Sequence, residues 1–267
     1  MKFELNTAWL AAAAFDWLMI AFAVCIAYCS PWLFPVSVLL IGNRQHALGI
    51  LGHDGAHKLV CRRSKRINDC VTNLVAFYPL GMCLREYRKF HRDHHLYTNN
   101  DRDPEVLLKD TQPNPIITGP VTLRKVLRHG LMDLVGFGIP HEIKFMLYIR
   151  PRTLRESVPI MALALISVAL LFSPYYLIPI LWLTSLATSF WFFFRLRVWS
   201  EHVGLGEGET LQFSPTLFER ALFLPHNTWL HCEHHEKPAI EFNKLPALRT
   251  KQFPRLLDAI KESQVRK

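Results

Sequence analysis

The sequence is short of cysteine, and it lacks the motifs of several common enzyme classes. The six cysteines show no paired C-x-x-C spacing and fit a reducing compartment rather than a disulfide framework; they are Cys25, Cys29, Cys61, Cys70, Cys83 and Cys232. No G-x-S-x-G elbow, Walker loop, helix-opening G-x-G-x-x-G or H-E-x-x-H motif occurs. We therefore expect neither acyl-serine hydrolysis nor nucleotide binding. Because no internal repeat or low-complexity tract occurs either, residues 1–267 are treated as one domain.

Charge is nearly absent from two long stretches, although the chain has 31 lysines and arginines and 22 acidic residues. Residues 5–43 contain one charged side chain, Asp16, and residues 157–194 contain none. A buried helix of a soluble protein would show polar residues at a period of 3.6 within such stretches, and that pattern is missing here. The two stretches therefore indicate a protein that lies within a membrane.

Each of these stretches is long enough for two membrane crossings, because one spanning helix needs about 20 apolar residues. A turn signal lies near the middle of each stretch, at Ser30-Pro31 and at Ser173-Pro174. The sequence thus predicts an all-α integral membrane protein with four transmembrane helices in two hairpins. The predicted spans are about residues 8–29, 31–51, 157–173 and 175–195.

The distribution of basic residues predicts the orientation of these hairpins. All but two of the lysines and arginines lie in residues 52–155 and 195–267, and the hairpin tips have none. By the positive-inside rule, both termini and the segments 52–156 and 196–267 are expected on the cytoplasmic side of this multi-pass protein. We attribute the net charge of +9 to these segments, whose basic residues are expected to be attracted to anionic lipid head groups. No nucleic-acid-binding motif accompanies it, so we do not expect nucleic acid as a partner.

Histidine is abundant, with 13 copies, and nine of them lie in short clusters within these polar segments. Residues three and four apart share one face of a helix, so each cluster can direct its imidazoles at one point. The clusters are HDGAH with His53 and His57, HRDHH with His91, His94 and His95, SEHVG with His202, and HCEHH with His231, His234 and His235.

Imidazole is the commonest protein ligand of metal ions, and nine imidazoles are too many for one tetrahedral zinc ion. We therefore predict two metal ions at the cytoplasmic end of the helices. The ligand type alone leaves iron, copper, zinc and manganese open. The isolated His46, His129 and His141 are expected to be structural.

Carboxylates accompany every cluster. Metal-bound histidines usually donate their second ring N–H to a carboxylate or a carbonyl, which fixes the orientation of the ring. The acidic residues expected in this role, each of which could equally be a solvated surface acid, are Asp54, Asp93, Asp101, Asp103, Glu201 and Glu233.

At these residues the sequence resembles the membrane fatty acid desaturase and hydroxylase superfamily. The resemblance is carried by HDGAH, HRDHHLYTNNDRDPE, RVWSEH and HCEHHEKPAIEFNKLP, and it extends from about Arg44 to Leu248. It implies a cytoplasmic helical cap and a non-haem centre of two iron ions held by the nine clustered histidines. It also implies O2 as co-substrate and electrons from a separate protein of the ferredoxin, rubredoxin or cytochrome type.

One position departs from the pattern of this superfamily. Some acyl desaturases have an asparagine that binds metal through water, four residues before the isolated histidine. Here Val198 holds that position before His202. We expect Asn227 or His226 to be the alternative candidate for this additional ligand.

The leading hypothesis is an oxidase of lipids or acyl chains, namely a fatty acyl desaturase that introduces a C=C bond. A carotenoid ketolase or hydroxylase, or another lipid hydroxylase of the same superfamily, remains an alternative, because compact chains with similar H-x-E-H-H and D-P motifs occur there. A membrane metal transporter or metal-binding protein is the alternative from another class. Transport sites tend to lie near the bilayer midplane, where Asp16 is the only ionisable residue predicted here.

Overall fold

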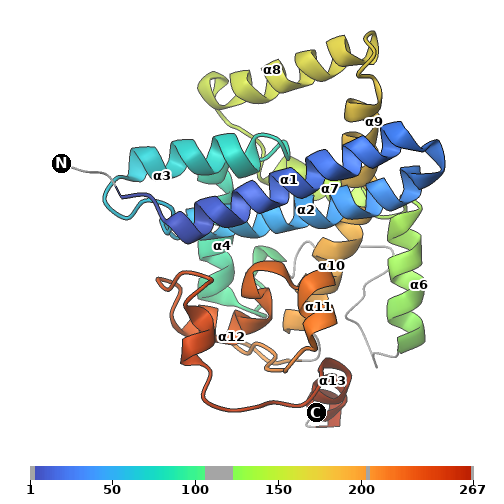
Figure 1. Ribbon diagram of the computed structural model, residues 1–267. Helices are drawn as coiled ribbons and strands as arrows, with labels where there is room; N and C mark the ends of the chain where they lie inside the picture. The colour runs from blue at the N-terminus through green and yellow to red at the C-terminus, as the bar shows by residue number, and fades with distance from the viewer. Residues whose placement is uncertain (1–3, 106–122, 203–204, 266–267) are drawn as a thin grey trace.

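The computed structural model describes residues 4–105, 123–202 and 205–265, and within these ranges it contains helices and no β-strand (Figure 1). The longest helices are α1 (Thr7–Cys29), α2 (Phe34–Ala56), α8 (Leu154–Leu171) and the continuous run of α9 (Leu177–Ser185), a π-helical turn (Leu186–Phe190) and α10 (Trp191–His202). The shorter helices are α3 (Lys65–Thr72), α4 (Leu84–Tyr97), α6 (Leu123–Leu134), α7 (Ile139–Tyr148), α11 (Leu217–Leu222), α12 (His231–Glu236) and α13 (Leu256–Val265).

Helices α1 and α2 form an antiparallel hairpin (Figure 1). The side chain of Asn6 accepts a hydrogen bond from the backbone N–H of Trp9 and so caps the start of α1. The helix ends at Ser30, whose backbone is extended, and the following proline opens a short 3₁₀ turn that leads into α2. The indole N–H of Trp9 donates to the carbonyl of Leu51 at 2.9 Å, which ties the start of α1 to the last turns of α2.

Three helical stretches are long and apolar enough to cross a membrane: Thr7–Cys29, Leu154–Leu171 and Leu177–His202. They correspond to the first, third and fourth spans that the sequence predicts. Helix α2 is as long as α1, but polar residues from Asn43 to His46 interrupt its apolar character. An integral membrane protein is thus supported, whereas the arrangement of four spanning helices stays a prediction.

Helix α2 lies at the centre of the fold, and small residues allow its neighbours to approach it closely. A Cβ atom on Gly42 would lie 2.0 Å from Oγ of Ser189, which donates its hydroxyl hydrogen bond to the carbonyl of Val38 at 2.6 Å. A Cβ atom on Gly52 would overlap the ring of Phe77. Substitution of either glycine would therefore push apart the helices that surround α2.

A buried polar network joins the two helices of the first hairpin to the C-terminal segment. Asp16 is fully buried, and its carboxylate accepts hydrogen bonds from Nη1 of Arg44 at 3.0 Å and from Nε2 of His226 at 2.8 Å. The neighbouring Asn43 accepts from Arg44 and donates its amide to the carbonyl of Leu222. The acidic residue in α1 therefore has two partners, one in α2 and one in the segment that leads to α12.

We expect Asp16→Ala to lower the free energy of unfolding by about 3 to 5 kcal/mol, because it leaves the Arg44 guanidinium buried without its counter-charge. Thermal unfolding of the detergent-solubilised protein measures this effect. Asp258→Ala is the matched control, since the carboxylate of Asp258 is exposed and its ion pair with Lys261 is loose at 3.6 Å. Equal melting temperatures for the two variants would contradict a structural role for the network.

Candidate metal centre

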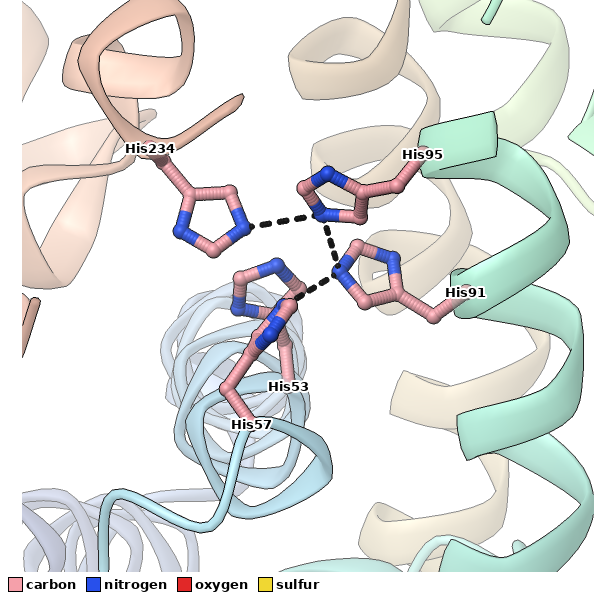
Figure 2. Close-up of side chains that lie close together, drawn as sticks. All are labelled: His53, His57, His91, His95 and His234. Atoms are coloured by element: carbon pink, nitrogen blue, oxygen red, sulfur yellow. Dashed lines mark hydrogen bonds between the residues drawn. The ribbon is translucent and has the colours of Figure 1, made fainter. Parts of the chain in front are cut away.

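The nine clustered histidines converge into two adjacent groups. The first group contains His53, His57, His91, His95 and His234, and the second contains His94, His202, His231 and His235. Within each group, one nitrogen atom of every ring lies within 4.8 Å of the corresponding nitrogen atoms of the others. Figure 2 shows the first group, whose rings point toward one another from α2, α4 and α12. Segments far apart in the sequence thus form one site.

Helical spacing decides which histidine joins which group. In HRDHH on α4, the first and last histidines are four residues apart and join the first group, whereas the middle one joins the second. In HCEHH on α12, the assignment is reversed: His231 and His235 join the second group and His234 joins the first. Each of the two helices therefore contributes two histidines to one group and one histidine to the other.

The distances between ring nitrogens suit metal coordination. In the first group the Nε2 atoms of His57 and His91 lie 2.8 Å apart, those of His91 and His95 2.9 Å, and those of His95 and His234 3.1 Å. In the second group the Nε2 atom of His231 lies 3.1 Å from that of His202 and 3.0 Å from that of His235.

Two nitrogens bound at about 2.1 Å to one ion lie about 3.0 Å apart at a right angle and about 3.4 Å apart at the tetrahedral angle. The number of ligands is the clearer guide: the first group offers five nitrogens, more than a tetrahedral ion takes, and the second group offers four.

The first group also contains a buried imidazole nitrogen that makes no hydrogen bond to the described residues. This nitrogen is Nε2 of His53. Its ring packs against those of His91 and His234, with centroids 4.3 and 4.4 Å away. Leaving a buried polar atom unsatisfied is costly, so this nitrogen fits a place in the coordination of an ion.

Burial keeps these imidazoles neutral. It lowers the pKa of His57 to about 4 and that of His95 to about 3, and it holds the pKa of His91, His231 and His234 well below the ordinary value. A neutral imidazole has a free lone pair, whereas a protonated one has none. The site therefore presents metal-binding nitrogens at neutral pH.

The two groups lie in direct contact. The rings of His95 and His235 stack with centroids 4.2 Å apart. Members of both groups also line a small cavity of about 10 Å³, together with Phe90, Phe194 and Arg197. A cavity of this size has room for about one water-sized molecule. A small molecule in it would lie beside both groups.

Three of the expected carboxylates lie beside a clustered histidine. Asp103 is fully buried, and its two oxygens lie 3.0 and 3.1 Å from Nδ1 of His94. Asp54 lies 3.6 Å from Nδ1 of His53, and Glu201 lies 3.5 Å from Nδ1 of His231. Asp103 makes the strongest contact and leaves Nε2 of His94 to face the second group.

The other expected carboxylates have different partners or face the solvent. The carboxylate of Glu233 accepts hydrogen bonds from Nε and Nη2 of Arg249, the latter at 2.8 Å. It therefore holds α12 in place and does not orient an imidazole ring. Asp93 is partly exposed and pairs with Arg92 at 2.8 Å. Asp101 is exposed.

The candidates for an additional ligand lie elsewhere. Among the described residues, neither His226 nor Asn227 belongs to either histidine group. His226 binds Asp16, and the side chain of Asn227 donates to the carbonyl of Phe242 at 3.1 Å. Val198 is buried in α10 and offers no metal-binding atom.

Glu105 is a carboxylate at the centre that the sequence reasoning did not select. Its Oε2 lies 3.4 Å from Nε2 of His202 and 3.6 Å from Nδ1 of His94, so it adds an oxygen at the edge of the second group. The signal that could have found it is its place at the end of the NNDRDPE run, two residues after Asp103.

The fold and the site define an integral membrane protein with a histidine-rich centre suited to two metal ions. Residues 30–263 match the model of the fatty acid desaturase family. The chain belongs to this family. The match extends over the second helix of the first hairpin, the whole second hairpin and all the clustered histidines, so it confirms the resemblance carried by the histidine clusters.

The chain is also similar to a curated protein over a short segment. A stretch of 94 residues is 35% identical to dihydrorhizobitoxine desaturase of Bradyrhizobium elkanii. This stretch is 34% of the present chain and 26% of that protein. The similarity thus covers about a quarter of the length of the relative.

We expect Asp103→Asn to weaken metal binding by about 10- to 100-fold, because an amide is a poorer acceptor for the N–H of His94 than a carboxylate is. Titration of the metal-depleted protein with ferrous iron measures the affinity. Asp93→Asn is the control, since Asp93 pairs with Arg92. Equal affinities of the Asp103 variant and the wild type would show that this carboxylate does not orient the ring.

Proposed function

We propose that this chain is an O2-dependent di-iron oxidase of lipids, and specifically a fatty acyl desaturase. The observation that carries the proposal is the convergence of nine imidazoles into two touching groups of five and four. Membership in the fatty acid desaturase family supports the same conclusion. The partial relative is named a desaturase, which favours desaturation over hydroxylation or ketolation.

The chemistry of the centre matches the demands of this reaction. Unactivated C–H bonds resist ordinary acid–base groups, and a pair of iron ions held by the clustered histidines would supply the means to activate O2 as the oxidant. The overall reaction converts CH2–CH2 to CH=CH and reduces O2 to two molecules of water with two electrons and two protons from outside. The five nitrogens of the first group exceed the four ligands of a tetrahedral zinc ion, which favours iron.

The residues of the chain hold and orient this centre. The clustered histidines bind the two ions, Asp103 fixes the ring of His94, and Glu105 supplies a carboxylate at the second group. Burial of the rings limits the access of water to the centre. The small cavity beside both groups has room for about one water-sized molecule and is the place that we assign to O2; its lining includes Phe90, Phe194 and Arg197.

The two electrons come from a separate carrier of the ferredoxin, rubredoxin or cytochrome type. The basic segments that contain the histidines can attract a small acidic protein, because complementary charge speeds the encounter of two proteins.

Lipid profiling of a host that makes both acyl lipids and carotenoids tests the proposed reaction. Expression of the chain should raise the fraction of unsaturated acyl chains and leave the carotenoids unchanged. His94→Ala and His234→Ala should each abolish this change while membrane insertion is retained. His141→Ala, which removes a histidine outside both groups, should keep it. Oxidised carotenoid with unaltered acyl chains would contradict the desaturase assignment.

We propose in addition that four helices span the membrane and that both termini and the histidine groups face the cytoplasm. The support is the concentration of lysine and arginine in residues 52–155 and 195–267. A green fluorescent reporter fused after Lys267 should fluoresce, because it folds on the cytoplasmic side. Activity of an alkaline phosphatase reporter at the same position would contradict this orientation.

A further inference from the structure

We propose that the open groove between α1, α2 and α11 binds an acyl lipid with an anionic head group, drawn from the surrounding bilayer. The groove has a volume of about 730 Å³, which lies within the range of ordinary ligand sites. This binding is separate from the oxidation proposed above and does not depend on it.

The walls of the groove are apolar and suit a hydrocarbon chain. From α1 and α2 they contain Ala12, Phe15, Met19 and Leu40, which are at most partly buried. Three of these residues belong to α1, a helix apolar enough to cross a membrane. An acyl chain in this position would therefore stay in contact with the bilayer.

Helix α11 closes the other side of the groove and has the character of a membrane surface element. Its first two residues, Leu217 and Phe218, line the groove and are 81% and 69% exposed. Large apolar side chains at this exposure are costly in water but are typical of segments that lie in the head-group region of a bilayer.

Arg220 on the same helix supplies positive charge to the groove. Its guanidinium stacks over the ring of Trp229, with 4.2 Å from Cζ to the centroid, and its Nε has no hydrogen-bond partner among the described residues. The nearby acid of α11, Glu219, binds the backbone N–H of Thr216 in a capping box. Because this Nε of Arg220 is itself buried, the donors left for an incoming anion are the Nη groups, which make no hydrogen bond or ion pair with the described residues.

The remaining charges of the groove do not cancel that of Arg220. Arg44 also lines the groove, and the buried carboxylate of Asp16 is shared by Arg44 and His226. The guanidinium of Arg44 is thus paired with Asp16, whereas that of Arg220 has no carboxylate partner among the described residues and leaves a net positive charge in the apolar groove. Basic pockets beside membrane helices bind the phosphate of acidic lipids in this way.

Native mass spectrometry of the full chain with phosphatidylglycerol or phosphatidylcholine of identical acyl chains tests this site. We expect the wild type to bind phosphatidylglycerol about tenfold more tightly, and Arg220→Gln to lose this preference. Arg255→Gln removes the same charge from an exposed arginine outside the groove and should retain it.

A second variant tests the groove itself. Ala221→Trp introduces a large ring from an exposed position that lines the groove, and it should weaken the binding of both lipids by at least tenfold. The iron content of each variant should stay at the wild-type value, which separates this site from the metal centre. Equal lipid preference in Arg220→Gln and the wild type, equal loss in Arg220→Gln and Arg255→Gln, or unaltered binding by Ala221→Trp would overturn the proposal.

Discussion

The arrangement of the whole structure depends on one electrostatic constraint, the convergence of imidazole lone pairs in a buried space. A neutral imidazole nitrogen offers either one N–H or one lone pair. Nε2 of His91 faces both His57 and His95, and Nε2 of His95 faces both His91 and His234, all at 2.8 to 3.1 Å. Hydrogen bonds cannot satisfy all of these contacts at once, because each nitrogen has one site for two neighbours. A cation at the centre of each group satisfies every lone pair together.

The rest of the fold positions the imidazole rings of these histidines. Helix α2 supplies His53 from its last turn and is followed directly by His57, and glycines along the helix let the neighbouring helices pack close by. Helix α12 has six residues and is too short to hold its own orientation. It is fixed at one side by the ion pair of Glu233 with Arg249 and is preceded by the segment that His226 ties to Asp16. The HCEHH cluster on α12 therefore depends for its position on a charge buried in the first helix.

The sequence predicted those features that follow from local periodicity. The i, i+3 and i, i+4 spacing in HRDHH and HCEHH predicted convergent rings, and the charge-free stretches predicted apolar helices. The all-helical character is confirmed, as are three candidate spans. The spacing could not predict that His94 joins the second group and His234 the first, because that depends on how α4 and α12 meet in space. The contacts of Asp16 with Arg44 and His226 were unpredictable for the same reason, because these residues lie far apart in the sequence and meet only in the folded chain.

Carboxylates were the least predictable part of the site. Asp54, Asp93, Glu201 and Glu233 are alike in the sequence, since each lies in or beside a histidine cluster, and Asp103 lies further along the chain after HRDHH. The structure separates them by their partners: Asp103 binds an imidazole, Glu233 binds Arg249 and Asp93 pairs with Arg92. Glu105 shows the converse case, a carboxylate outside the HRDHH cluster that folding brings to His202.

The central claim is that two iron ions occupy these two groups. Anomalous X-ray diffraction from crystals of the protein, recorded on both sides of the iron absorption edge, tests it most directly. The account predicts two iron peaks, one enclosed by His53, His57, His91, His95 and His234 and the other by His94, His202, His231 and His235. A single peak, or a signal that appears only above the zinc edge, would contradict it.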